Sequence, residues 1–202
     1  MKRSRAPHES PTKTRLLDAA ERLMLAQGFS ATTVDEICEA AKLTKGSFFH
    51  YFQSKEQLGE ELLSRFCAAG SQLHRSFCGQ ERDPLKRVYR YVDAAARMAQ
   101  HPSTNHGCLL GGFAQELCDT HPGIRLVCEQ GFNEWARQFT EELARAKARY
   151  VPKASFRPRE LAEHFIALLE GSLILGKTRH NMAVVAQNLR QFKAYLRTLF
   201  KR

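Results

Sequence analysis

Apolar residues recur along this chain at intervals of three and four positions, which is the spacing of one face of an α-helix. In PTKTRLLDAAERLMLAQ, residues 11–27, the side chains that form this face are Leu16, Ala19, Ala20, Leu23 and Met24. No segment alternates apolar and polar residues for long enough to predict a strand. The pattern therefore predicts an all-α protein.

Start and stop signals divide the chain into about nine helices. Proline in a first turn marks helices that begin near Pro11, Pro84, Pro122 and Pro158. Two capping boxes, in which Thr33 and Ser54 are followed three residues later by Glu or Gln, mark two further starts, and Ser10 has the residue type of an N-cap. The expected helices cover about 11–27, 34–41, 44–52, 55–66, 84–100, 108–120, 122–150, 158–177 and 183–200.

Composition narrows the class of protein. A chain of 202 residues with 43% hydrophobic residues is long enough to bury a core. It has no apolar run of membrane-spanning length and no N-terminal signal peptide, so a cytoplasmic protein without a membrane segment is expected. Its six cysteines form no C-x-x-C pair, and the histidines lack zinc-finger spacing. We therefore expect no structural metal, disulfide framework or cofactor.

The formal charge of +10 is unevenly distributed, with about +3 in residues 1–55, −2 in 56–146 and +9 in 147–202. A basic arm that contains Lys2, Arg3 and Arg5 precedes every acidic residue, and such an arm can lie along a phosphate backbone. The C-terminal excess leaves open an architectural protein that binds DNA without sequence preference.

The stretch GSLILGKT, from Gly171 to Thr178, matches the phosphate-binding pattern G-x-x-x-x-G-K-[ST]. A phosphate loop needs a strand before it and a helix after it, whereas the apolar stripe of Leu169, Ser172 and Leu173 continues one helix through the match. We interpret the match as an accident within a helix. A nucleotide hydrolase stays a poor alternative, and because other enzyme motifs are absent we expect no enzyme.

Residues 32–58, TTVDEICEAAKLTKGSFFHYFQSKEQL, have helix-turn-helix spacing. Ile37, Phe48 and Phe52 can close a small core, with a tight turn near Lys42-Leu43. The second helix then exposes donors, a cation and aromatic rings that suit base edges and phosphates, while a glycine permits close approach of the backbone. Lys55 and Thr33, at helix starts, can meet phosphates. The candidate residues within the second helix are Thr44, Lys45, Gly46, Ser47, Phe49, His50 and Tyr51.

Residues 14–58, which include LLDAAERLMLAQGFSATT and this segment, resemble the DNA-binding domain of the TetR family of transcriptional regulators. The resemblance implies a DNA-binding domain over residues 1–55 and a helical effector-binding and dimerisation domain over 56–202. It also implies a homodimer, a double-stranded palindromic operator and a small-molecule effector. One departure is Phe49, where the family usually has tyrosine, so the hydrogen bond of that hydroxyl to phosphate is lost.

The stretch GCLLGGFAQELCDTHPGIR, residues 107–125, resembles the NemR-like branch of the family, some members of which sense electrophiles or oxidants through a cysteine that matches Cys108. Lys177 matches a lysine of that branch, and His106 is adjacent. We expect the start of a helix to stabilise a Cys108 thiolate, which would make it reactive. Two alternatives stay open: an inert packed Cys108, and a noncovalent apolar or aromatic ligand held near Phe113 and Trp135.

Overall fold

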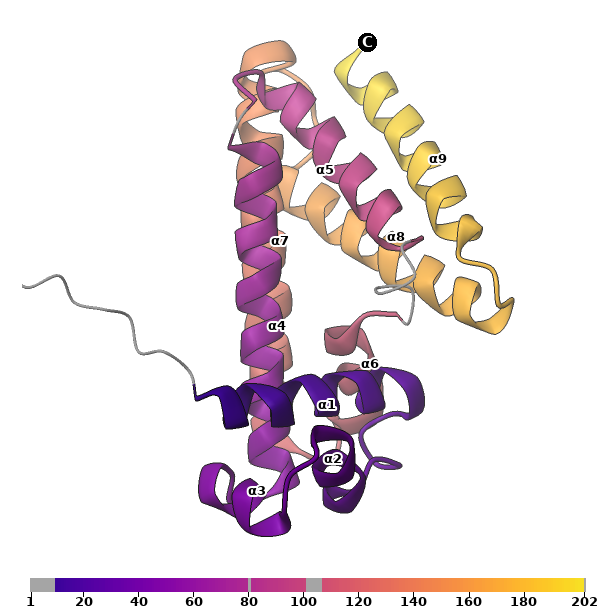
Figure 1. Cartoon of the computed structure of the whole chain (residues 1–202). Helices are drawn as coiled ribbons and strands as arrows, with labels where there is room; N and C mark the ends of the chain where they lie inside the picture. The colour runs from indigo at the N-terminus through magenta and orange to yellow at the C-terminus, as the bar shows by residue number, and fades with distance from the viewer. Residues whose placement is uncertain (1–9, 80, 101–106, 202) are drawn as a thin grey trace, which may run out of the picture.

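The computed structural model describes residues 10–79, 81–100 and 107–201, and within these ranges it contains nine α-helices and no strand (Figure 1). The all-α prediction and the expected number of helices are confirmed for this part of the chain. The helices are α1 (Pro11–Gln27), α2 (Val34–Ala41), α3 (Lys45–Tyr51), α4 (Lys55–Cys78), α5 (Pro84–Met98), α6 (Leu109–Leu117), α7 (Pro122–Tyr150), α8 (Pro158–Thr178) and α9 (Ala183–Phe200).

The helices form a small lower group and a larger upper group, and α4 runs between them (Figure 1). Helices α1, α2 and α3 lie at the lower end, while α5, α8 and α9 lie in the upper part. The two longest helices, α4 and α7, pack side by side, and α7 also packs against α5, α6 and α8. Because α4 begins four residues after the end of α3 and runs into the upper group, it is the chain's direct connection between the two groups (Figure 1).

Two hydrophobic cores hold these helices together. The lower core joins α1, α2, α3 and the first half of α4 to α6 and the start of α7, through residues such as Phe113 and Ile124. The upper core joins α5, α8 and α9 to the rest of α7, around Phe139 and Phe165. The proposed boundary between residues 55 and 56 stays a prediction, and the lower core extends well beyond it.

The predicted helix caps are formed at some positions and not at others. The Thr33 box is complete, because the Glu36 N–H donates to Thr33 Oγ1 at 3.2 Å and the Thr33 N–H donates to the Glu36 carboxylate at 2.7 Å. Ser54 accepts from the N–H of Gln57 at 3.2 Å, but the Gln57 side chain accepts from another N–H, so only half of that box forms. Ser10 is the N-cap residue of α1, as predicted, and its carbonyl accepts from the Thr14 N–H at 3.0 Å, but its hydroxyl makes no capping hydrogen bond.

The stretch GSLILGKT lies entirely inside α8, as its helical periodicity predicts. Leu169, Ser172 and Gly176 are buried along one face, and the Ser172 hydroxyl donates to the Leu168 carbonyl one turn earlier at 2.6 Å. A Cβ at Gly176 would lie 2.6 Å from the Met182 sulfur, so the glycine permits close packing. The phosphate-loop match is thus part of a packed helix. Among the described residues, no helix is long and apolar enough to span a membrane.

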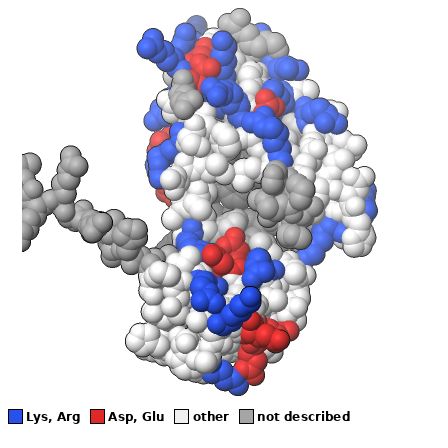
Figure 2. Space-filling model, in the orientation of Figure 1, with Lys and Arg blue, Asp and Glu red and all other residues white. Residues whose placement is uncertain are grey.

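Basic side chains are most numerous on the upper part of the molecule. Figure 2 shows many Lys and Arg and a few Asp and Glu side chains over the upper part, and adjoining basic and acidic groups at the lower end. The C-terminus lies at the upper end, opposite α3 (Figure 1). The C-terminal excess of positive charge is therefore not on the helix-turn-helix surface.

Candidate DNA-binding and sensor sites

The turn between α2 and α3 depends on a left-handed residue. Lys42 has φ 52°, and its N–H together with that of Leu43 donates to carbonyls in the last turn of α2. The Thr44 hydroxyl then accepts from the N–H of Ser47 at 3.2 Å and caps α3. Phe48 and Phe52 are buried beneath α3, with ring centroids 5.5 Å apart. The predicted helix-turn-helix is present, and its core fixes which face of α3 is outward.

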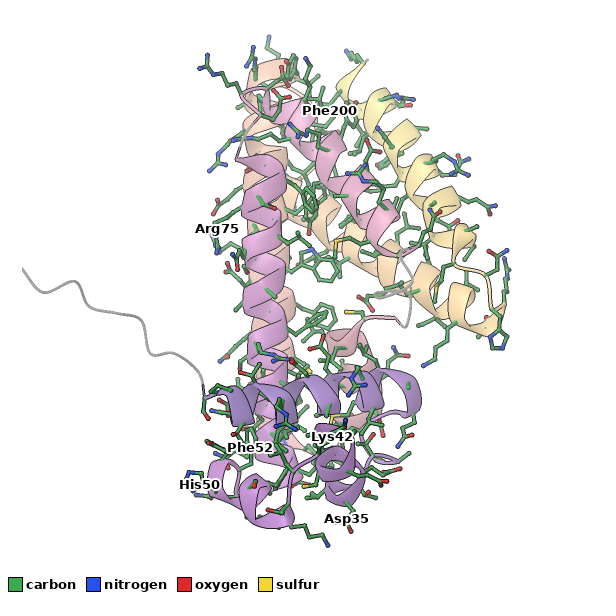
Figure 3. All side chains as sticks on the ribbon, viewed as in Figure 1. Asp35, Lys42, His50, Phe52, Arg75 and Phe200 are labelled. Atoms are coloured by element: carbon green, nitrogen blue, oxygen red, sulfur yellow. The ribbon has the colours of Figure 1, made fainter. Side chains whose placement is uncertain are left out.

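The outward face of α3 carries most of the predicted DNA-contacting residues. Phe49 is 57% exposed, which is unusual for a large apolar side chain and suits contact with a thymine methyl group or a sugar. Figure 3 shows His50 at the outer edge of α3. A Cβ at Gly46 would meet only the Thr44 hydroxyl, at 3.7 Å, so this position is open on the outside. The exposed residues of the row are Thr44, Lys45, Gly46, Phe49 and His50, and Ser47 is half-buried.

Lys45 is held by a neighbour on α2. Its ammonium lies 2.8 Å from the Asp35 carboxylate, and both side chains are mostly exposed. The hydrogen bond to Asp35 and the charge of that carboxylate raise the pKa of Lys45. Because an exposed ion pair is weak, DNA phosphates or base acceptors can compete for this ammonium. Lys45 is therefore available to DNA at little cost.

Tyr51 and Lys55 are less free than the sequence suggests. The Tyr51 hydroxyl pairs with the Ser10 hydroxyl at 2.8 Å, and the residue is half-buried. The Lys55 ammonium donates to the carbonyls of Phe29 and Thr32 at 2.9 and 2.8 Å and lies 4.3 Å from the Phe29 ring centroid. In this geometry the Lys55 ammonium holds the α1–α2 loop, so a phosphate contact at Lys55 would have to come from the N–H groups at the start of α4.

Thr33, the N-cap residue of α2, is already hydrogen-bonded to the carboxylate of Glu36. Both the N–H and the hydroxyl of Thr33 donate to Glu36 Oε2, at 2.7 and 2.8 Å. These hydrogen bonds lower the pKa of Glu36 and keep the carboxylate charged. A phosphate at this helix start would have to displace or share that carboxylate.

A second site is a cleft of about 410 Å³ between the lower and upper groups of helices. Cys108, Phe113 and Lys177 line it, as does the end of α1 at Gly28 and Phe29. Three of the residues predicted to sense an effector therefore lie together. His106 lies outside the described residues, and Trp135 does not line this cleft.

Trp135 belongs to a separate aromatic group in the upper core. Its ring N–H donates to the Tyr91 hydroxyl at 2.6 Å, and its ring stacks on Phe132 with centroids 6.3 Å apart. Tyr91 in turn packs on Phe139 and Phe165. The expectation that Trp135 and Phe113 share one aromatic pocket is thus wrong, because Trp135 packs within the upper core.

The Cys108 thiol is not acidic in this structure. The residue is the N-cap of α6, as expected, but burial raises the pKa of its thiol well above the usual range, and the neighbouring Glu170 carboxylate raises it further. The N–H groups of Gly111 and Leu110 lower the pKa, but their effect is smaller. The expectation of a thiolate stabilised by the helix start is therefore wrong, and the resting group is a thiol.

Two acidic residues complete the region and were not predicted from the sequence. Glu170, on α8, accepts a hydrogen bond from the Cys108 thiol, and burial raises the pKa of its carboxyl group. Glu116, near the end of α6, accepts from the Phe29 and Ser30 N–H groups at 2.9 and 2.7 Å. Glu170 interrupts the apolar stripe of α8 between Leu169 and Leu173, and that interruption is the signal that could have found it.

An outward helix held over a small core by a tight turn is the geometry with which helix-turn-helix proteins enter the major groove, so the fold and α3 define a DNA-binding protein. Residues 16–62 match the family model of bacterial regulatory proteins of the tetR family. Residues 84–191 match the C-terminal domain of LmrA/YxaF-like transcriptional regulators. The chain belongs to the TetR family of transcriptional regulators, as its sequence predicts, and it is a DNA-binding regulator.

Individual relatives agree with this assignment. The HTH-type transcriptional repressor DhaR of Mycobacterium sp. (strain GP1) is 27% identical over 184 residues, which are 89% of each chain. The HTH-type transcriptional repressor NemR of Escherichia coli (strain K12) is 28% identical over 194 residues, 94% of this chain and 96% of NemR. The crystal structure of reduced E. coli NemR superposes with a TM-score of 0.81 at 26% identity, over 91% of this chain and 95% of that chain.

Proposed function

We propose that this protein is a homodimeric repressor that leaves a palindromic operator when an electrophile reacts with Cys108. The observation that carries the proposal is that Cys108 shares one cleft with Gly28 and Phe29, which end α1 of the DNA-binding domain. A chemical change at the thiol is thus made directly against the element that supports α2 and α3. The similarity to NemR and DhaR, which are named as repressors, supports the repressor part.

Glu170 supplies the base that a neutral thiol requires. Its carboxylate accepts the Cys108 hydrogen bond, and its raised pKa makes it a better proton acceptor than an exposed carboxylate. With an α,β-unsaturated carbonyl, the sulfur forms a bond to the β-carbon while its proton passes to Glu170. The proton then moves to the α-carbon of the enolate, so the adduct is neutral. Lys177, in the same cleft, offers a cation to the enolate oxygen.

Helix α6 carries the change to the DNA-binding domain. Cys108 precedes its first turn, and Glu116 near its other end binds the Phe29 and Ser30 N–H groups. A Cβ at Gly111 would lie 2.1 Å from Glu170 Oε2, so α6 and α8 are in close contact beside the cleft. An adduct at Cys108 that displaces Glu170 would move α6 relative to α8, and Glu116 would move with α6.

Dimer formation sets the geometry of DNA binding. Exposed apolar side chains on α8 and α9, namely Ile174, Leu175 and Tyr195 at 46%, 41% and 44% exposure, support an interface between two copies there. Two copies of α3 would then enter successive major grooves, about 34 Å apart. Displacement of α1 by α6 changes this spacing, and the operator is released.

The first experiment measures the affinity for DNA from upstream of the protein's own gene, by fluorescence anisotropy, before and after stoichiometric alkylation with N-ethylmaleimide. We expect alkylation to weaken binding at least tenfold in the wild type and to leave Cys108→Ser unchanged. Cys118→Ser is the matched control, because Cys118 is also half-buried and lies at the opposite end of α6. This variant should lose affinity on alkylation as the wild type does.

Equal loss of binding in wild type and Cys108→Ser would overturn the sensor assignment. Tight binding that alkylation leaves unchanged would instead favour a reversible ligand. A specific observation supports that second candidate, because Phe113, Leu173 and Ile174 give the same cleft apolar walls. In a thermal-shift assay, small aromatic compounds should then raise the Tm of the wild type more than that of Phe113→Ala.

A separate experiment tests whether α3 contacts the bases of the DNA. Lys45→Ala should change which base pairs are preferred, because the ammonium is exposed on α3. Lys86→Ala is the matched control, since Lys86 is an exposed lysine on α5. An unchanged sequence preference in Lys45→Ala would show that this residue does not read bases.

A further inference from the structure

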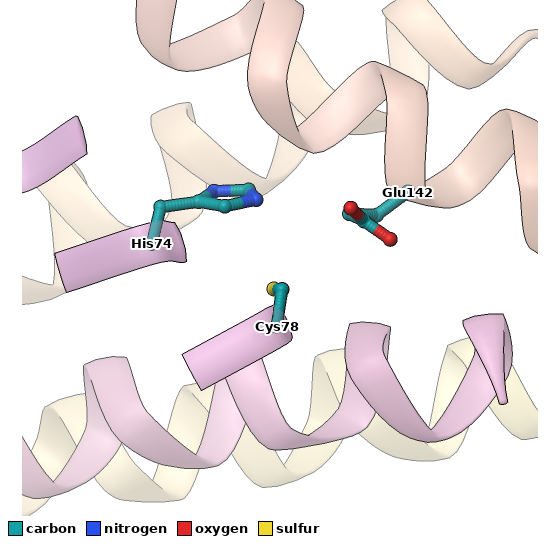
Figure 4. A group of neighbouring side chains, drawn as sticks. All are labelled: His74, Cys78 and Glu142. Atoms are coloured by element: carbon teal, nitrogen blue, oxygen red, sulfur yellow. The ribbon is translucent and has the colours of Figure 1, made fainter. Parts of the chain in front are cut away.

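Three buried side chains with metal-binding atoms converge between α4 and α7, away from the Cys108 cleft (Figure 4). His74 and Cys78 lie one helical turn apart at the end of α4, and Glu142 faces them from α7. One ligand atom from each residue lies within 4.8 Å of the other two. Their exposures are 6%, 3% and 5%, so all three are removed from solvent.

The polar atoms of this cluster are incompletely satisfied by the protein. His74 Nδ1 and Glu142 Oε2 are buried and have no hydrogen-bond partner. Arg87 Nε lies 2.8 Å from that carboxylate oxygen, but it too lacks hydrogen-bond geometry. Buried polar groups are normally paired, and each unpaired one costs stability. Two potential metal ligands of the cluster, His74 Nδ1 and Glu142 Oε2, are therefore buried without a hydrogen bond, although Glu142 Oε2 forms an ion pair with Arg87.

We propose that His74, Cys78 and Glu142 bind one divalent transition-metal ion of the zinc type. Imidazole nitrogen, thiolate sulfur and carboxylate oxygen together form a donor set that such ions accept in tetrahedral geometry, and three protein ligands leave the fourth position for water. On binding, the Cys78 S–H bond breaks, the proton leaves to solvent and the sulfur bonds to the metal. The bound ion would tie the end of α4 to α7.

Two arginines bear on the charge of this site. Arg87 contacts Glu142 Oε2, and Arg145 donates to Glu142 Oε1 at 2.8 Å. Their positive charges oppose a metal ion, and the negative carboxylate and thiolate offset them. Because each carboxylate oxygen contacts an arginine, a metal ion bound at Glu142 Oε2 has to displace Arg87 Nε, while Arg145 can remain on Oε1 and orient the ligand.

Cobalt is the probe, since Co²⁺ occupies zinc sites and reports its ligands in its absorption spectrum. The full-length reduced protein is titrated with Co²⁺ in the presence of a phosphine reductant. We expect a thiolate-to-cobalt charge-transfer band that saturates at one ion per chain and disappears when Zn²⁺ displaces the cobalt. Cys78→Ser should abolish this band, and His74→Gln should weaken Co²⁺ binding at least tenfold.

Cys128→Ser is the matched control, because Cys128 is another buried thiol and lies near Cys118 and Cys67 instead. Its band should equal that of the wild type. Absence of the band in wild type, its persistence in Cys78→Ser or its loss in Cys128→Ser would each overturn the assignment. X-ray absorption of the zinc-loaded wild type needs no variant: one sulfur neighbour is expected, and none or more than one would contradict the site.

Discussion

Replacing Glu116 by glutamine tests how α6 holds the DNA-binding domain. The Glu116 carboxylate accepts from the Phe29 N–H at 2.9 Å and the Ser30 N–H at 2.7 Å. Glutamine keeps the size of the side chain but has only one acceptor oxygen and no charge. One of the two backbone N–H groups then loses its hydrogen bond, and the other donates to an uncharged amide oxygen, which is a weaker acceptor.

The size of the effect follows from these two hydrogen bonds. Bonds to a charged acceptor contribute about 1.5–3 kcal/mol each when shielded, and Glu116 is exposed, so we expect a loss of only ~1–2 kcal/mol in the free energy of unfolding. For a chain of 202 residues, this corresponds to a decrease in Tm of about 2–8 °C.

The difference in Tm between the wild type and Glu116→Gln should also depend on pH. Burial raises the pKa of Glu116, but the hydrogen bonds from Ser30 and Phe29 and the charge of Lys55 outweigh it, so the pKa in the folded protein is lowered. The folded state then binds this proton less readily than the unfolded state does. The stabilisation is complete at neutral pH and is lost as the pH falls through the lowered pKa of the folded state. Glutamine does not titrate, so its Tm should approach that of the wild type in acid.

The assay is thermal unfolding by circular dichroism at one fixed protein concentration, from neutral to acidic pH. Glu129→Gln is the control, since Glu129 is an exposed residue on α7. Its free energy of unfolding should differ from that of the wild type by no more than about 0.5 kcal/mol, the effect of an ordinary surface substitution. Equal Tm values for wild type and Glu116→Gln at neutral pH, or a difference that does not shrink in acid, would refute this account of the α6 contact.

Three further substitutions can be compared by urea unfolding. Gly28→Ala should cost ~1–3 kcal/mol, because Gly28 has φ 89° and a new Cβ would lie 3.0 Å from Glu116 Oε2; no loss would contradict the strain. Phe48→Ala should cost ~3–5 kcal/mol, because the ring is fully buried, and a loss near zero would exclude it from the core. Ser54→Ala should cost about 1 kcal/mol, because the hydroxyl caps α4; unchanged stability would mean that water replaces the cap.

The fold could be predicted because its signals are local. Pro11, Pro84, Pro122 and Pro158 begin helices where the sequence indicates, since a proline in a first turn lacks only an N–H that the helix does not need. The same locality explains why GSLILGKT could be recognised as helix: the buried face of α8 continues from Leu169 through Ser172 to Gly176.

The sites depend on contacts that no local pattern contains. The raised pKa of the Cys108 thiol could not be predicted, because burial in the folded protein, together with the Glu170 carboxylate on α8, outweighs the effect of the α6 helix start. The position of the Lys55 ammonium depends on carbonyls at Phe29 and Thr32, across the α1–α2 loop. Ser10 has the residue type of an N-cap, but its hydroxyl pairs with Tyr51, which only the folded chain brings near.

The shared lower core also governs when the protein becomes functional during its synthesis. The hydrophobic core of the DNA-binding helices includes Phe113 of α6 and Ile124 and Cys128 of α7. A nascent chain that has emerged only as far as α4 cannot close this core, because these partners have not yet left the ribosome. The core beneath α3 is therefore complete only after α6 and the start of α7 have been made. A prematurely terminated chain without α6 lacks part of this core.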